Sequence, residues 1–449
     1  MLAYAGFTLA AIAVFALRPA REAAAWSYFG GWLILPVAAY PPFFQSMTVT
    51  PIEIMGLVLP ADMLISKAAA IAAATCLASL IVDFRRWPTL RLRALDLALL
   101  AWCGWPLLRA ALTGDPASGL APSAYMLAAW GGSWLIGKLY FAGEDGAAAL
   151  LKAIAWSGVA LLPVALLELV RGPTVYTLLY GRHPFSMDGI DRYVGYRPLA
   201  MFEDGNQYGV WMAMAAVAAI ALARCDRRWR STAIVLIVTS LASQSVGAIL
   251  LLAVGVLALS GRVRIAARWW KAGTIATGAG AVLYLSGLVP FERIARHTSL
   301  GGHVLALVRS TGRGSLLWRV SQDQKVMPLL HQHLLIGWGR WDWWTPIGFR
   351  PWGVPMLVVG QFGVVGLALM IAVVLVAPVL VLARNGVGSA IGAVAIVAVM
   401  AAADAALNSF IFWPAIIAVG ALGNCRSAQN ASNTVDNRDR PLSMPRRNP

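Results

Sequence analysis

Apolar stretches long enough to cross a lipid bilayer follow one another along almost the whole chain. A membrane-spanning helix needs about 20 consecutive, mostly apolar residues. Thirteen candidate spans are bounded by charged residues or by glycine and proline. They lie near 1–17, 25–43, 61–83, 94–112, 120–141, 147–170, 206–223, 231–243, 245–259, 268–289, 354–382, 387–403 and 408–423. Several are short, notably 231–243 and 387–403, so a count of twelve spans is an alternative.

The composition excludes a soluble protein. Only 12% of the 449 residues are charged, about half of what a soluble domain carries, and 59% are hydrophobic. These values exclude soluble enzymes, nucleic-acid-binding domains and disordered scaffolds. The apolar stretches also lack the alternation of a membrane barrel. The sequence therefore predicts an all-α, polytopic helical bundle of 12–13 transmembrane helices, and its four cysteines, which have no CxxC spacing, predict no metal knuckle.

Basic residues gather on alternate loops. One side carries Arg18, Arg21, Arg85, Arg86, Arg91, Arg93, Arg224, Arg227, Arg228, Arg230, Arg262, Arg264, Arg268, Lys271, Arg384 and the arginines of the C-terminal tail. The short loops on the other side carry almost nothing beyond Arg109. The positive-inside rule places the basic side in the cytoplasm. The C-terminus is then cytoplasmic, and the N-terminus lies outside for thirteen spans and inside for twelve.

The spans divide the chain into six parts. These are N-terminal transmembrane helices (1–170), a first outer loop (171–205), central helices (206–289), a large outer loop (290–353), C-terminal helices (354–423) and a polar tail (424–449). The tail is rich in Asn, Ser, Arg and Pro, which is typical of disorder.

The large outer loop is basic, against the expected bias. It holds Arg293, Arg296, Arg309, Arg313, Arg319, Lys325, Arg340 and Arg350 against only Glu292, Asp323 and Asp342. Guanidinium groups match paired phosphate oxygens, so the cluster favours a phosphate site, with contact to lipid headgroups as the alternative. The spacing of apolar residues over 315–335 predicts an amphipathic helix, with Arg319 and Asp323 as an i,i+4 pair.

Aromatic and histidine residues follow in the same loop. The tryptophans of Gly337–Trp344, including Trp338 and Trp341, are either interfacial anchors or a platform on which sugars stack. His331 and His333 stand two residues apart and cannot share a helix face, which argues against a metal site. His331 is still a candidate base.

Other polar residues lie near the outer ends of spans. Glu203 and Asp204, close to Arg197, form either a structural ion pair at a helix entrance or part of a polar site. Lys67 and Glu168 fall inside predicted spans, near their outer ends, where they either snorkel or pair, and Asp404 lies between two short spans, close to the outer face. An ionisable residue in the bilayer region is a functional hypothesis by default.

Four motifs occur in a recognisable order: Arg197 to Gly209, SQSVGA at Ser243–Ala248, Arg319 followed by Gly337–Gly339, and QFGVVGL at Gln361–Leu367. Together with the closing stretch ADAALNSFIF and the membrane topology, they resemble the O-antigen polymerase and O-antigen ligase superfamily of bacterial membrane glycosyltransferases, in its exopolysaccharide-associated subgroup. A single one of these motifs is too variable to identify the superfamily, so the resemblance rests on their order and on the topology. The resemblance extends from about residue 170 to residue 425.

The resemblance implies a GT-C type glycosyltransferase that joins undecaprenyl-diphosphate-linked glycan units at the periplasmic face of the inner membrane. It implies no cofactor and no metal. Arg197 and Arg319 inherit the diphosphate-binding role by position, and Arg313 and Arg340 are weaker candidates. The implied partners are the lipid-linked oligosaccharide, membrane lipids and other polysaccharide assembly proteins, with no nucleic acid.

The sequence departs from the pattern of this superfamily at two positions, and both bear on which residue acts as the catalytic base. Trp352 stands where many relatives carry a histidine, and SQSVGA lacks their arginine. Either Glu203, Asp204, His331 or Asp404 serves as the base, or the chain is a divergent or inactive member. Three other functions are alternatives: ligase-type transfer to an acceptor, a peptidoglycan-type polymerase, and a flippase or exporter, which predicts discontinuous spans and polar residues at the bilayer midplane.

Overall fold

The protein is all-helical in the computed structural model. The structure describes residues 2–37, 66–181, 183, 195–260, 297–310, 315–408 and 410–423, with a few single positions between 272 and 294. No β-strand forms within these ranges, as the sequence predicted. The predicted tail at 424–449 and most of the predicted span at 268–289 lie outside the described residues.

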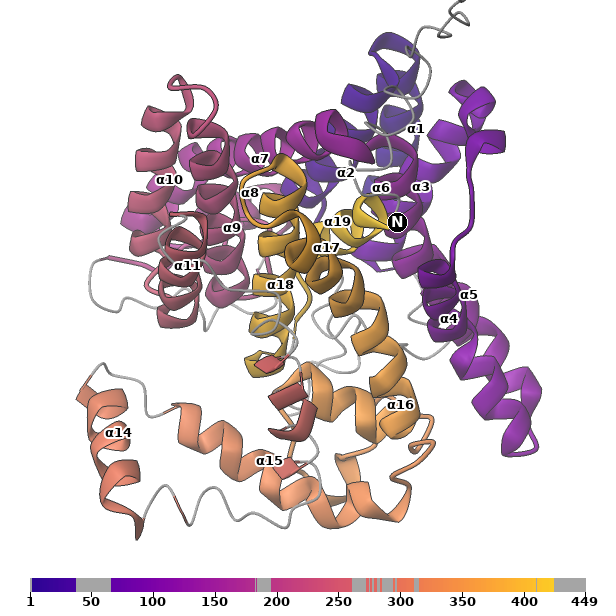
Figure 1. Ribbon diagram of the computed structural model, residues 1–449, viewed down its shortest axis with the longest axis vertical. Helices are drawn as coiled ribbons and strands as arrows, with labels where there is room; N and C mark the ends of the chain where they lie inside the picture. The colour runs from indigo at the N-terminus through magenta and orange to yellow at the C-terminus, as the bar shows by residue number, and fades with distance from the viewer. Residues whose placement is uncertain are drawn as a thin grey trace, which may run out of the picture.

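Most of the described helices overlap a predicted span, and those at Thr174–Tyr180, Ser299–Ser310 and Ser315–Gln332 lie in the predicted outer loops. Two pairs of helices are each joined by a π-helical turn. Leu127–Gly131 joins the helices Leu120–Met126 and Gly132–Tyr140, and Ala372–Val376 joins the helices Val354–Ile371 and Ala377–Asn385. The helices are α1 Leu2–Leu17, α2 Ala20–Ile34, α3 Lys67–Val82, α4 Ala94–Leu112, α5 Leu120–Met126, α6 Gly132–Tyr140, α7 Gly143–Arg171, α8 Thr174–Tyr180, α9 Gly205–Ala223, α10 Trp229–Ala242, α11 Val246–Leu259, α14 Ser299–Ser310, α15 Ser315–Gln332, α16 Val354–Ile371, α17 Ala377–Asn385, α18 Ala390–Leu407 and α19 Pro414–Leu422 (Figure 1).

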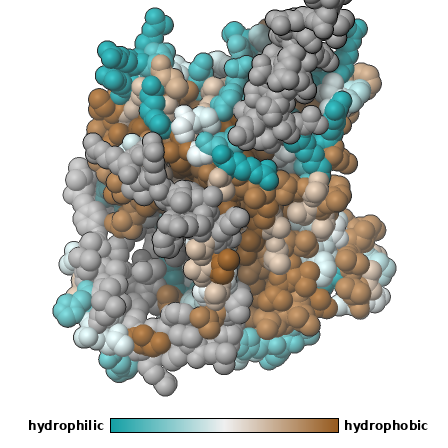
Figure 2. All heavy atoms as spheres, in the orientation of Figure 1, coloured by the Kyte–Doolittle hydropathy of each residue, from teal (hydrophilic) through white to brown (hydrophobic). Residues whose placement is uncertain are grey.

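Four of the described helical runs are long and apolar enough to cross a membrane: Ala94–Leu112, Gly143–Arg171, Gly205–Ala223 and Val354–Asn385. Shorter apolar helices lie beside them, among them α1, α3, α10, α11 and α18. Figure 2 shows hydrophobic residues over the middle and lower right of one face, with hydrophilic residues gathered above and below. This distribution is what a bilayer-embedded helical protein requires.

Helix α9 lies at the centre of the bundle. Nearly all of its residues are buried, and alanine dominates the stretch Ala213–Ala221. It packs against α7, α10, α11 and α18. Small side chains let helix backbones approach closely, which is how helices associate where no hydrophobic effect drives them together. The segment that leads into α9, with Arg197, Glu203 and Asp204, forms one part of the candidate site.

The basic loops meet at one end of the bundle, here called the basic end. Arg93 donates to the carbonyl oxygen of Gly423 at 3.3 Å, and Arg224 donates to that of Val387 at 3.0 Å. Glu144, at the start of α7, accepts from the backbone N–H groups of Ala390 and Ile391. These contacts connect loops that are far apart in the sequence.

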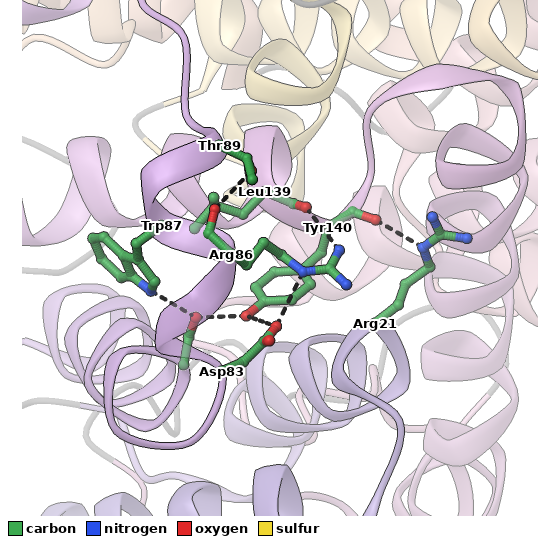
Figure 3. A network of polar contacts seen from close by, with 8 residues as sticks. Arg21, Asp83, Arg86, Trp87, Thr89, Leu139 and Tyr140 are labelled. Atoms are coloured by element: carbon green, nitrogen blue, oxygen red, sulfur yellow. Dashed lines mark hydrogen bonds and ion pairs between the residues drawn. The ribbon is translucent and has the colours of Figure 1, made fainter.

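A compact polar network ties α2, α3 and α6 together at this end (Figure 3). Arg86 pairs with Asp83 at 3.0 Å and donates to the carbonyl oxygen of Leu139 at 3.2 Å. The Tyr140 hydroxyl donates to Asp83 at 3.1 Å, and Arg21 donates to the Tyr140 carbonyl oxygen at 2.9 Å. The arginines at this end are therefore partly bound by carbonyl groups at helix ends.

The opposite end, called the site end, gathers the N-terminus and the predicted outer segments. The Tyr4 hydroxyl donates to the carbonyl oxygen of Pro36 at 3.2 Å, which places the start of α1 beside the end of α2. Arg109, in the last turn of α4, donates to the carbonyl oxygens of Ile336 and Gly337, each at 3.2 Å. Its charge thus holds the 336–339 segment in place.

Helix α16 is interrupted at Gly363, within the QFGVVGL motif. Gly363 has φ 73° and ψ −178°, and a Cβ there would lie 2.0 Å from the carbonyl oxygen of Leu335. The backbone N–H groups of Trp338 and Gly339 donate to the carbonyl oxygens of Gly360 and Gln361, each at 2.8 Å. On the other side of the break, Val364 N–H donates to the Leu334 carbonyl oxygen at 2.9 Å. The backbone of 334–339 therefore pairs with groups that the interruption frees from the helix.

Candidate functional site

Segments that carry the four motifs converge at the site end. Arg197 belongs to the segment that leads into α9, and Ser243 to the hairpin between α10 and α11. Arg319 lies on α15, Trp352 just before α16, and Asp404 in the last turn of α18. Hydrogen bonds and cation–π contacts connect several of these segments to one another.

Arg197 joins the first two motifs. Its side chain is 1% exposed, and its Nη2 donates to Asn206 Oδ1 at 2.6 Å. Its Nε donates to the carbonyl oxygen of Ser243 at 3.3 Å, while the Ser245 hydroxyl donates to the same Asn206 oxygen at 3.1 Å. Gly205 leaves room for this guanidinium, because a Cβ there would lie 2.2 Å from Arg197 Nε.

The two acidic residues next to Arg197 begin α9. Asp204 Oδ1 accepts from the backbone N–H groups of Asn206 and Gln207, each at 2.7 Å, and so caps the helix. Glu203 is buried, and its backbone N–H donates to Gln207 Oε1 at 3.0 Å. The negative charges of both residues reach Arg350. Burial lowers the pKa of the Arg350 guanidinium to about 10, and the charges of Glu203 and Asp204 act in the opposite direction.

Trp352 brings two arginines together. The guanidinium carbon of Arg319 lies 5.4 Å from the centre of the Trp352 ring, and that of Arg350 lies 5.2 Å from it. The Trp352 backbone N–H donates to Asp323 Oδ1 at 3.1 Å. Asp323 also accepts from the Tyr284 hydroxyl at 2.7 Å, and burial raises the pKa of its carboxyl. Trp352 thus occupies the predicted histidine position as a platform for two cations.

Asp404 connects to the same group through Asn408. The Asn408 Nδ2 donates to Asp404 Oδ1 at 2.7 Å, and Arg319 Nη1 donates to Asn408 Oδ1 at 2.7 Å. Asp404 is 3% exposed, and both Arg319 and Asp204 interact with its carboxyl electrostatically. A carboxyl, a carboxamide and a guanidinium therefore follow one another from α18 to α15.

The helix predicted over 315–335 exists as α15. Its predicted i,i+4 partners reach different groups, since Arg319 donates to Asn408 and Asp323 binds Tyr284 and the Trp352 backbone. Arg319 still acts electrostatically on Asp323. The two side chains thus interact electrostatically, as their spacing predicts, but they form hydrogen bonds with different segments of the site.

Other predicted residues lie in the segment that packs on the interrupted α16. Arg340 is paired with both carboxylate oxygens of Asp342, at 2.7 and 2.8 Å. Trp338 Nε1 donates to the Leu329 carbonyl oxygen at 3.1 Å, and Trp341 is a buried ring against Trp344. His331 is an exposed residue of the last turn of α15, and Arg313 lies outside the described residues.

Sequence reasoning missed Asn408 and gave Arg350 no individual role. Asn408 is four residues after Asp404, a spacing that places two polar side chains on one helix face, and this signal was available. Arg350 stands two residues before the position at which a histidine was expected, yet nothing in the sequence reveals its approach to Glu203 and Asp204. Within the described ranges, no group of three or more His, Cys, Asp or Glu side chains could hold a metal ion.

The arrangement suits an anionic ligand with a reacting hydroxyl. Fixed guanidinium groups stabilise charge that develops on phosphate oxygens, and a buried carboxyl is suited to accept a proton. Comparisons with models of known protein families, with curated proteins and with solved structures found no match to this chain.

Proposed function

We propose that the chain is a membrane glycosyltransferase that polymerises or transfers undecaprenyl-diphosphate-linked glycan units at the periplasmic face of the bacterial inner membrane. One observation carries the proposal: Arg319 and Arg350 lie over the same ring, Trp352, and Arg319 is joined to Asp404 through Asn408. Two cations and a carboxyl are the groups that glycosyl transfer from a lipid diphosphate needs.

Arg319 and Arg350 are assigned to the diphosphate. Cleavage of the glycosyl bond leaves negative charge on the departing phosphate oxygens, and a guanidinium presents paired donors that never deprotonate near neutral pH. Their contacts with Trp352 and Asn408 limit their freedom before substrate binds, so less reorganisation is needed at the moment of reaction. Arg197 is buried against Ser243 and Asn206, and its role here is to position the start of α9.

Asp404 is assigned as the base for the acceptor hydroxyl. The Asp204 carboxylate already accepts two backbone N–H groups, which favours a structural role for it. Asp404 is instead oriented by a side chain, Asn408, whose carbonyl oxygen is bound by Arg319. This arrangement supplies a base in a chain that has Trp352 in place of the histidine.

The two ends of the bundle support the orientation. The basic end holds the cytoplasmic loops by the positive-inside rule, so the site end faces the periplasm. Helix α1 starts at the site end, and α19 ends beside Arg93 at the basic end. An odd number of crossings connects these points, which favours thirteen spans over twelve.

The test is to change Arg319 and Arg350, each to Ala and to Lys, and to profile long-chain polysaccharide in cells that depend on this protein. Loss of one donor to a developing charge lowers rates by about 10²–10³-fold, and lysine lacks the paired donors, so we expect short or no chains from all four variants. Arg171→Ala is the matched control, since Arg171 is an exposed arginine at the same end. Normal chain length in the Arg319 and Arg350 variants would contradict the assignment.

A transporter is the second candidate, because the interruption of α16 at Gly363 is a feature of transporter helices. In this chain, however, backbone groups at the break bind the backbone of 334–339. Purified protein in detergent separates the two functions: glycan product formed from lipid-linked units without a sealed membrane supports the enzyme. Supplying a separate acceptor in the same assay distinguishes a ligase from a polymerase.

A further inference from the structure

Three buried titratable side chains from separate segments bind the backbone of one short turn, Leu199–Phe202. Glu168 Oε2, on α7, accepts from the N–H groups of Leu199 and Ala200 at 2.9 and 2.7 Å. Lys67 Nζ, at the start of α3, donates to the Met201 carbonyl oxygen at 2.7 Å. His183 Nε2 donates to the Phe202 carbonyl oxygen at 3.0 Å. Each residue of the turn is therefore held by one of these side chains.

The turn needs such support. Its four residues are at most 3% exposed, so their backbone groups have no bulk water to bind. Ala200 has φ 50°, a left-handed conformation that is unfavourable for a residue with a Cβ. The carboxylate of Glu168 faces two successive N–H groups, which is a typical anion-binding arrangement of backbone.

Lys67 and Glu168 are both buried, and each is hydrogen-bonded to the backbone of the turn. Lys67 is 1% exposed and Glu168 is 0% exposed, and burying one charge without an opposite charge or hydrogen bonds is costly. Lys67 also lies 5.3 Å from the centre of the Trp32 ring and 5.7 Å from that of Phe202. His183 stays neutral near pH 7, because burial and the charge of Lys67 lower its pKa to about 4.

The turn lies between the two halves of the candidate site. Arg197 precedes it by two residues, and Glu203 and Asp204 follow it directly. A shift of Leu199–Phe202 would therefore move the arginine relative to the carboxylates and to the first turn of α9. The intramembrane charges at 67 and 168 act on the site through this backbone.

We propose that Lys67 and Glu168 are positioning residues that clamp the Leu199–Phe202 turn and so fix Arg197, Glu203 and Asp204 in the site. The catalytic consequence rests on the proposed function, but the clamp itself does not. Lys67 acts as a hydrogen-bond donor to the turn, and Glu168 acts as an acceptor from it. An N–H group needs an acceptor and a carbonyl oxygen needs a donor, so the two side chains cannot exchange places.

The test is amide hydrogen exchange over residues 196–204 of the full chain in lipid nanodiscs, combined with the polysaccharide profile. We expect Glu168→Ala and Lys67→Met to raise exchange at Leu199 and Ala200 by at least about tenfold, because the protecting contacts of the turn are lost. Lys67→Arg, which keeps a donor and the charge, should retain most of the protection. The reversed pair, Lys67→Glu with Glu168→Lys, should not restore it.

Glu144→Ala is the matched control. Glu144 lies on the same helix as Glu168 and also accepts from two backbone N–H groups, but at the basic end. Its loss should leave exchange over 196–204 unchanged. Where Glu168→Ala does not fold, Glu168→Met supplies the same readout, since it removes the acceptor oxygens with little change in side-chain length.

The outcomes separate the clamp from the proposed function. Unchanged exchange in the Glu168 and Lys67 variants, or restored protection in the reversed pair, would overturn the clamp even if the Arg319 variants stop polysaccharide synthesis. Raised exchange with normal polysaccharide would support the clamp but would contradict its effect on catalysis. Raised exchange with shortened chains, and recovery of both in Lys67→Arg, is the result that supports the full inference.

Discussion

Trp352 shows how one residue changes the chemistry of a site. A histidine at this position would bring a proton acceptor, whereas an indole brings a flat apolar face with negative potential. Arg319 and Arg350 both lie within 5.5 Å of the centre of that ring, at 5.4 and 5.2 Å. In the proposed enzyme, the role of base then passes to Asp404, and Trp352 serves to hold two cations near each other.

Substitution of Trp352 tests this view. Each cation–π contact is worth about 0.5–2 kcal/mol, so loss of both in Trp352→Ala should lower polysaccharide synthesis by about tenfold. Trp352→Phe keeps an aromatic face and should retain most of the activity. The measurement is the rate of product formation with purified protein and lipid-linked units. Equal activities in the Ala and Phe variants would show that the ring does not act through the arginines.

At the scale of elements, the helices were largely predictable. The span predicted at 94–112 is α4, and that at 206–223 is α9 to within one residue. Long apolar runs bounded by charge leave few alternatives to a helix. The span predicted at 408–423 is shorter, because α19 begins at Pro414. Asn408 lies in a non-helical segment before it, where its carbonyl oxygen accepts from the Val354 N–H at 3.1 Å.

The interruption of α16 was not predictable from hydropathy, since the run Val354–Ile371 is continuously apolar apart from Gln361. Gly363→Ala should destabilise the protein severely, because φ at this position is 73° and the new Cβ would lie 2.0 Å from the Leu335 carbonyl oxygen. Thermal unfolding in detergent measures the effect.

Gly104→Ala provides the comparison for this experiment. Gly104 lies inside α4 and has no neighbour within 4 Å of an added Cβ. Alanine at an unhindered helical position is favoured over glycine by about 0.5–1 kcal/mol, so this variant should be at least as stable as the native protein. Similar melting temperatures for the two variants would mean that the break in α16 tolerates a continuous helix.

At the scale of the whole molecule, the loops separate into two ends. Contacts such as Arg93 with Gly423 and Arg224 with Val387 connect the basic loops, and Arg109 with Ile336 and Gly337 connects outer segments. In the proposed orientation, the positive-inside rule predicts that the basic end faces the cytoplasm and the site end faces the periplasm. The free, exposed Cys225 lies between α9 and α10 at the basic end and is a native reporter of orientation.

Labelling with a membrane-impermeant maleimide tests the orientation in spheroplasts. A variant that keeps Cys225 as its only cysteine should label only after the membrane is permeabilised. A variant whose only cysteine replaces Ser118, an exposed residue of the loop between α4 and α5, should label in intact spheroplasts. The reverse pattern would place the candidate site in the cytoplasm and remove the proposed periplasmic reaction.

The sequence by itself determined the helical class, the positions of most helices and the separation of a basic end from a site end. These properties follow from local hydrophobicity and from the sum of charges in each loop, which need no knowledge of contacts. The tertiary structure alone decided which charges act together. Arg340 is bound by its neighbour Asp342, whereas Arg350 reaches Trp352 and the charges of Glu203 and Asp204. Partner choice depends on how distant segments pack, because a buried polar group takes whatever donor or acceptor the fold places within about 3 Å.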